Sequence, residues 1–74
     1  MGIAQKEERS GMKNKVKQHR LLAEMTQSDL AKAIAVSRQT IHAIESGKYV
    51  PSTELALKLA KRFSTSVENL FQLD

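Results

Sequence analysis

Apolar residues recur at helical spacing in two short neighbouring segments of this chain. In chain order these residues are Leu30, Ile34, Ile41 and Ile44. Spacings of four and three positions place each pair on one side of a helix. We therefore predict two short helices, at about residues 27–35 and 38–46, that are joined by a tight turn and packed by their apolar sides.

Capping residues mark the beginning of both predicted helices. Thr26 precedes Asp29 by three positions, the spacing of a capping box in which hydroxyl and carboxylate each accept a backbone N–H. Ser37 offers the same hydroxyl to the second helix. Gly47 follows its end, where a left-handed backbone favours a residue without Cβ.

Three further helices are predicted at about residues 14–24, 53–63 and 67–71, with caps at Asn14, Ser52 and Ser66. Their apolar sides are expected to carry Val16, Ala23, one or both of Leu21 and Leu22, Leu55, Ala56, Leu59, Ala60, Phe63, Val67, Leu70 and Phe71. Five helices with very short connections cannot form a long up-and-down bundle. The pattern therefore predicts an all-α, compact five-helix domain over residues 12–74, in which the helices at 27–35 and 38–46 cross steeply.

Residues 1–11 differ from the rest, with one bulky aliphatic side chain, two glycines and balanced charges. We expect them to form a flexible N-terminal extension. The whole chain has 12 Lys and Arg against 8 Asp and Glu, a formal charge of +4 that favours polyanionic partners. The absence of cysteine fits a reducing cytoplasm, and no apolar run approaches the roughly 20 residues that span a bilayer.

Catalytic chemistry has little support in the sequence. His19 and His42 are the only histidines, there is no cysteine, and no glycine-rich loop could cradle a phosphate. We therefore expect neither an enzyme nor a site for a metal, cofactor or small-molecule ligand.

The outer side of the helix at 38–46 carries Arg38, Gln39, His42 and Ala43. Arginine and glutamine near the beginning of an exposed helix have the paired donors and acceptors that match the major-groove edges of guanine and adenine. Taken alone, the same residues also fit an ordinary solvated helix surface.

The sequence also contains four motifs that are typical of one protein family. In chain order they are T-Q-S-D-L-A, V-S-R-Q-T-I-H-A-I-E-S-G-K-Y, P-S-T-E-L-A-L-K-L-A and S-V-E-N-L-F. With them, residues 12–71 resemble the helix-turn-helix domain of the phage lambda repressor and Cro (XRE-type) transcriptional regulators, in particular short stand-alone bacterial members. The resemblance implies a lambda-repressor-like fold and double-stranded DNA as partner.

The resemblance also implies roles for individual residues. The base-contacting positions correspond to Arg38, Gln39, Thr40, His42 and Ala43. The phosphate-contacting positions correspond to Gln27, Ser37, Ser46, Lys48 and Tyr49. Arg20 and Glu45 match a structural ion pair that orients the reading helix, although two independent solvated charges are the alternative.

Four positions depart from the family pattern. His19 occupies a usually aliphatic place in the first helix and is expected in the core or at its boundary rather than as a ligand. Glu24, Ala35 and Ser64 occupy turns in which the family often has Gly or Asn. A left-handed backbone at such residues costs roughly 1 kcal/mol each.

These observations favour a cytoplasmic, sequence-specific DNA-binding transcriptional regulator, which we interpret as a homodimeric repressor that reads the major groove with the helix at 38–46. The alternative is an antitoxin or co-regulator that also binds DNA but acts chiefly by binding another protein.

Overall fold

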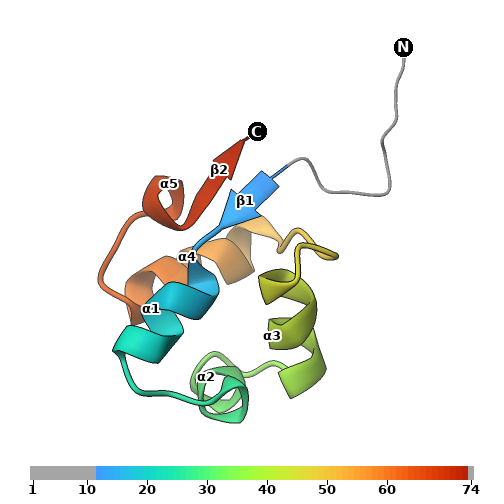
Figure 1. Ribbon diagram of the computed structural model, residues 1–74, viewed down its shortest axis with the longest axis vertical. Helices are drawn as coiled ribbons and strands as arrows, with labels where there is room; N and C mark the ends of the chain where they lie inside the picture. Colours follow the sequence, from blue (N-terminus) through green and yellow to red (C-terminus); the bar gives the residue numbers. More distant parts are fainter. Residues whose placement is uncertain (1–11, 74) are drawn as a thin grey trace.

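The computed structural model describes residues 12–73, which form five helices and two short strands (Figure 1). In chain order the elements are β1 (Met12–Asn14), α1 (Val16–Leu22), α2 (Gln27–Ala33), α3 (Arg38–Glu45), α4 (Thr53–Arg62), α5 (Val67–Leu70) and β2 (Phe71–Leu73). All five predicted helices are present, and α2 and α3 cross steeply. The predicted flexible extension over residues 1–11 lies outside the described residues.

The two strands make the all-α prediction approximate. β1 and β2 pair antiparallel, with Asn14 opposite Phe71, so the prediction that Phe71 continues the last helix was wrong. Phe71 is extended and buried, and the Lys15 N–H donates to the Leu70 carbonyl over 2.8 Å. Strands of three residues are too short to leave a recognisable alternation in the sequence, and only the meeting of the two chain ends creates them.

Asn14 joins this small sheet to α1 and α3. Its Oδ1 accepts the Val16 N–H at 3.1 Å, at the beginning of α1, and its Nδ2 donates to the Ile44 carbonyl at 2.9 Å. The N-cap of α1 is Lys15, without a side-chain cap hydrogen bond, so the prediction of Asn14 as the cap was wrong, although the Asn14 side chain accepts the first helical N–H. The same side chain also ties β1 to the last turn of α3.

The core is aliphatic and draws on every helix. Its buried residues are Val16, Leu30, Ala31, Ile34, Ile41, Ile44, Leu55, Ala56, Leu59, Ala60, Leu70 and Phe71. The four residues predicted to face inward from α2 and α3, and the four predicted in α4 before Phe63, are all among them. Each helix therefore contributes only a few side chains, as a domain of this size requires.

The predicted inner side of α1 was wrong at its C-terminal end. Leu21 and Leu22 are 56% and 83% exposed, and Ala23 is exposed too. α1 instead buries Val16 and, four positions later on the same side, Arg20. A charged residue on the inner side breaks the apolar periodicity from which the prediction was made.

The predicted caps of α2 to α5 are confirmed. Thr26 and Asp29 form a complete capping box, with the Asp29 N–H donating to Thr26 Oγ1 and the Thr26 N–H donating to Asp29 Oδ2, both over 2.9 Å. Ser37, Ser52 and Ser66 each accept the backbone N–H three residues later. Local sequence therefore defines the beginnings of α2 to α5.

The turns that depart from the family pattern adopt the left-handed backbone expected of them. Glu24, Ala35 and Ser64 have φ angles of 57°, 62° and 54°, close to the region in which Gly47 has 81°. The chain therefore adopts the connections of this fold with residues that are strained in them.

Replacing Ala35 by glycine is expected to increase the free energy of unfolding by about 0.5–1 kcal/mol, because glycine adopts positive φ without strain. Chemical denaturation followed by circular dichroism measures this change. Ala33→Gly, at an exposed helical position two residues earlier, is the matched control and should lower the free energy of unfolding by about 0.5–1 kcal/mol. A loss of stability in both variants would contradict the strain assigned to Ala35.

The capping box also makes stability depend on pH. The backbone N–H of Thr26, with its hydroxyl as a second contributor, lowers the pKa of Asp29 below its ordinary value of 3.8. Because the folded state binds this proton less tightly, the stabilisation is present above pH 3.8 and is lost as pH falls through the lowered value. Denaturation between pH 2 and pH 6 should show this loss in the wild-type protein and not in Asp29→Asn. Equal pH dependence in both proteins would assign the loss to other groups.

Candidate nucleic-acid interface

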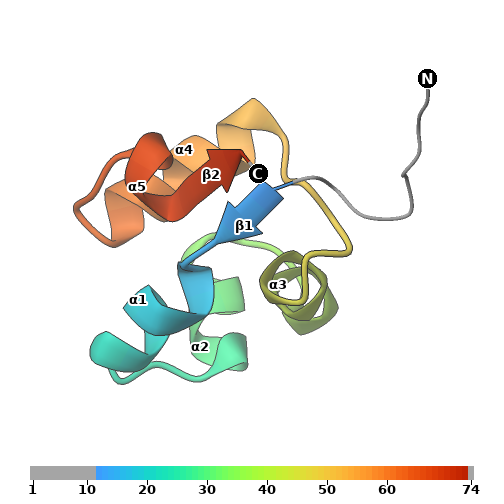
Figure 2. The ribbon, with the colours of Figure 1, turned by 45° about the horizontal axis from the view of Figure 1, so that its top comes forward.

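α3 lies at the edge of the molecule, with α2 and the sheet on one side of it (Figure 2). Ile41 and Ile44 on its inner side are completely buried. Arg38 and Gln39, in its first turn, are exposed, with Gln39 on the opposite side and Arg38 on the flank where it meets Gln27 of α2. The first turn of α3 therefore offers its side chains to a partner while its inner side is held by the core.

The other predicted base-contacting residues differ in exposure. His42 is exposed, whereas Thr40 and Ala43 are half-buried. The Thr40 hydroxyl lies 2.9 Å from the Ser37 hydroxyl and shares a hydrogen bond with it. Thr40 and Ala43 thus lie at the margin of the exposed surface.

The predicted phosphate-contacting residues lie at both ends of α3 and at the beginning of α2. Ser37, Ser46, Lys48 and Tyr49 are exposed, and Gln27 is half-buried. The Ser46 hydroxyl donates to the Ala43 carbonyl over 3.1 Å, so only its lone pairs remain available to donors. The Lys48 ammonium has no hydrogen bond to any of residues 12–73, and it can meet an anion directly.

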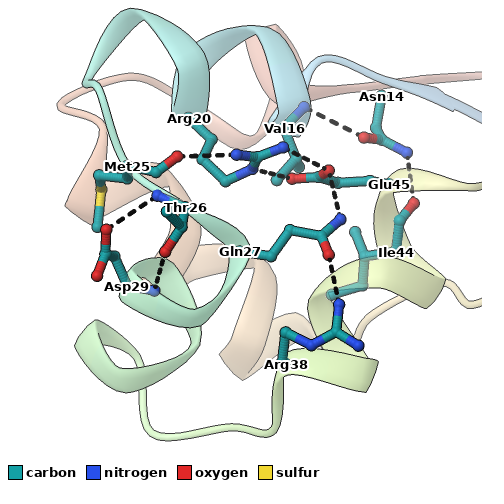
Figure 3. Close-up of polar contacts among 10 residues, drawn as sticks. All are labelled: Asn14, Val16, Arg20, Met25, Thr26, Gln27, Asp29, Arg38, Ile44 and Glu45. Atoms are coloured by element: carbon teal, nitrogen blue, oxygen red, sulfur yellow. Dashed lines mark hydrogen bonds and ion pairs between the residues drawn. The ribbon is translucent and has the colours of Figure 1, made fainter.

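Arg20 and Glu45 are brought together across 25 positions of sequence. Arg20 is 8% exposed, and its Nε and Nη2 donate to the two Glu45 carboxylate oxygens over 2.7 and 3.2 Å. Its Nη1 donates to the Met25 carbonyl over 2.8 Å. The hydrogen bond to Glu45 raises the pKa of Arg20, and the guanidinium stays charged. This forked pair connects α1 to the last turn of α3 and to the turn before α2 (Figure 3).

Gln27 extends this contact toward the exposed side of α3. Its Nε2 donates to Glu45 Oε1 over 3.1 Å, and its Oε1 accepts from Arg38 Nη1 over 3.1 Å. Arg20, Glu45, Gln27 and Arg38 therefore form one continuous row of hydrogen bonds from the interior to the surface (Figure 3). Sequence reasoning missed the two contacts of Gln27, because no spacing indicates contacts across 18 and 11 positions.

This arrangement of two crossed helices, with an exposed and partly preorganised polar surface on the second, is matched by a known family. The helix-turn-helix family profile matches residues 16–70, which cover α1 to α5. The chain belongs to the helix-turn-helix family.

Named relatives of this helix-turn-helix protein are also short. It is 58% identical over 60 residues to MJ0272 of Methanocaldococcus jannaschii, an uncharacterised helix-turn-helix transcriptional regulator, covering 81% of this chain and 91% of that protein. It is 49% identical over 63 residues to YgzD of Bacillus subtilis, of the same description, covering 85% of this chain and 96% of that one.

A crystal structure from Bacteroides fragilis, of a protein provisionally assigned to DNA binding, has a similar fold. The TM-score is 0.74 at 26% identity, and the match covers 82% of this chain and 98% of the other. The resemblance to XRE-type regulators drawn from the four motifs is therefore confirmed at the level of the family.

Lys17 is a cation near α3 for which the sequence indicated no role. Lys17 lies with Arg20, Gln27, His42, Glu45 and Ser46 around a surface hollow of about 260 Å³ between α1 and α3. Lys17 is exposed, so it adds a positive charge beside α3. Its cluster with Lys13 and Lys15 in the sequence was the available signal, although that signal did not distinguish a partner from solvent.

The two histidines occupy different environments. His19 is half-buried with its ring centroid 5.6 Å from that of Phe63, as expected at the edge of the core, while His42 is exposed. Among residues 12–73, no three His, Asp or Glu side chains are grouped to hold a metal ion. Within the same residues, no helix has the length and apolar character needed to traverse a bilayer.

Proposed function

We propose that this DNA-binding transcriptional regulator of the helix-turn-helix family is a cytoplasmic repressor that acts as a homodimer and inserts α3 into the major groove. The observation that carries the proposal is the exposed first turn of α3. Its Arg38 and Gln39 project from a helix whose other side is completely buried. Paired donors and acceptors on a rigid support are what direct recognition of base edges requires.

The proposed division of labour follows exposure and hydrogen bonding. Arg38 and Gln39 contact base edges, with Thr40, His42 and Ala43 at the margin. Lys48 and Tyr49 contact phosphate from the end of α3, and Gln27 and Ser37 approach it with short polar groups. Ser46 donates to phosphate once its hydroxyl turns away from the Ala43 carbonyl. Phosphate contacts position the helix, and base contacts supply sequence preference.

A homodimer follows from the size of the domain. A single small domain buries limited DNA surface, whereas two copies related by a two-fold axis present two α3 helices to half-sites about one helical turn apart. A palindromic binding site is therefore expected.

Selection of bound sites from random double-stranded DNA at two salt concentrations tests this function. We expect an enriched, two-fold symmetric motif, and affinity that falls steeply with salt because lysine and arginine displace counterions from phosphates. Recovery of unenriched DNA at both salt concentrations would contradict sequence-specific recognition. A promoter reporter that carries the selected site then tests repression, and increased expression on addition of the protein would contradict it.

A further inference from the structure

The hydrogen bonds of Gln27 permit only one orientation of its amide group. Its Nε2 faces Glu45 Oε1 and its Oε1 faces Arg38 Nη1, each at 3.1 Å (Figure 3). A carboxylate can only accept hydrogen bonds and a guanidinium can only donate them. The amide therefore satisfies both neighbours in this orientation and in no other.

We propose that Glu45, which lies too deep to meet DNA, determines the base preference of Arg38 by fixing the orientation of the Gln27 amide between them. This inference rests on the proposed function, in which Arg38 contacts a base edge. Glu45 is thus a positioning residue for specificity, in addition to its part in the ion pair.

The contact with Gln27 restrains the Arg38 side chain but does not involve the two donors that would contact a base. Gln27 engages Nη1 only, and neither Nε nor Nη2 of Arg38 has a hydrogen bond to any of residues 12–73. Nε and Nη2 together form the two-donor edge that matches O6 and N7 of guanine. An arginine restrained in this way offers that edge in one direction, whereas a free arginine also reaches neighbouring bases and phosphates.

Glu45 can impose this orientation because it is itself immobilised. Its side chain is 5% exposed, and both of its carboxylate oxygens accept from Arg20. The oxygen that faces Gln27 therefore cannot rotate away into solvent. Arg20 holds Glu45, Glu45 orients Gln27, and Gln27 restrains Arg38.

The Glu45→Gln variant reverses the proposed orientation while preserving side-chain size. The new amide is expected to keep its oxygen on the 2.7 Å contact with Arg20 Nε, because this contact is shorter than the 3.2 Å contact with Arg20 Nη2, and its NH₂ group then faces Gln27. Gln27 then turns its oxygen toward this group and its own NH₂ toward Arg38. Two donors now face each other, and Arg38 is released.

The readout is the dissociation constant for the selected site changed at one base pair, divided by the dissociation constant for the selected site itself. That base pair is the one at which Arg38→Ala abolishes preference. Glu45→Gln is expected to lower this ratio by about two- to tenfold, which corresponds to the ordering of one flexible side chain. Because both constants scale with the active fraction of protein, partial unfolding does not alter the ratio.

A second substitution should restore the ratio. In Glu45→Gln combined with Gln27→Glu, the carboxylate at position 27 accepts from both the new amide and Arg38. We expect a wild-type ratio together with weaker binding to all sequences, since the added negative charge opposes phosphate. A ratio no higher than that of Glu45→Gln alone would overturn the proposal.

Two more variants separate positioning from stability. Arg20→Lys loosens the ion pair but leaves the Glu45 carboxylate facing Gln27, so it should lower the free energy of unfolding and lower the ratio less than Gln27→Leu does. Gln27→Leu keeps the ion pair and removes the bridge, so it should lower the ratio even if Glu45→Gln does not fold. An unchanged ratio in Gln27→Leu, or an equal loss in Arg20→Lys, would overturn the proposal. Absence of preference in the wild-type protein would instead contradict the proposed function.

Discussion

Glu45→Ala is expected to lower the free energy of unfolding by about 3–5 kcal/mol, because it leaves the charged Arg20 guanidinium in the interior with 8% of its surface exposed and no counter-charge. Arg20 would keep only the Met25 carbonyl as a partner. A domain of 74 residues has a total stability of roughly 4–11 kcal/mol. The variant should therefore lose a quarter or more of this stability and unfold at a lower temperature and urea concentration than the wild-type protein.

Thermal and urea denaturation followed by circular dichroism measure this loss. Glu54→Ala is the matched control, because Glu54 pairs with Lys58 at 3.7 Å on the exposed side of α4, where an ion pair contributes at most about 0.5 kcal/mol. Replacing both Arg20 and Glu45 by methionine should recover part of the stability, since no buried charge is then left unpaired. Similar losses in Glu45→Ala and Glu54→Ala would show that burial of the Arg20 pair has no energetic consequence.

Arg38→Ala and Lys48→Ala are expected to weaken DNA binding in different ways. Loss of the two-donor edge of Arg38 should weaken binding to the selected site by about 1–3 kcal/mol and relax preference at one or two base pairs. Lys48 lies beyond the end of α3 with its ammonium unpaired among residues 12–73. Its loss should weaken binding to all sequences alike. It should also reduce the slope of log K against log salt concentration by about one, because one counterion fewer is released.

Titration of each variant with the selected duplex and with a scrambled duplex, at two salt concentrations, distinguishes these effects. Gln18→Ala, at an exposed position of α1, is a control that should change neither affinity nor preference. If Arg38→Ala and Lys48→Ala behaved identically on matched and scrambled DNA, the proposed division between base and phosphate contacts would be wrong.

The helices and their beginnings could be predicted because their causes are local. A cap at Ser37 needs only a hydroxyl three residues before an N–H. Ile41 and Ile44 are buried together because residues three positions apart lie on the same side of a helix. The strain at Ala35 was equally local, since φ is restricted by the residue's own Cβ. Family resemblance added the expected partner and the positions that face it.

The strands and the inner side of α1 could not be predicted in the same way. β1 and β2 depend on the meeting of Asn14 and Phe71, 57 positions apart, and neither strand is long enough to show a period of two. Arg20 occupies an inner position that hydrophobic periodicity assigns to an aliphatic residue. Its burial is tolerated only because Glu45 lies opposite it, and this contact forms only when α1 and α3 pack together.

The sequence by itself determined the five helices, the caps of α2 to α5 and the set of polar residues on α3, because propensity, periodicity and capping act within a few residues of each other. Only the tertiary structure decided how those polar residues are held. Gln27 and Arg38 come from different helices, and Glu45 meets Gln27 only after α3 has packed against α1. Hydrogen bonds between distant side chains depend on distance and direction in space, and both are established when the core closes.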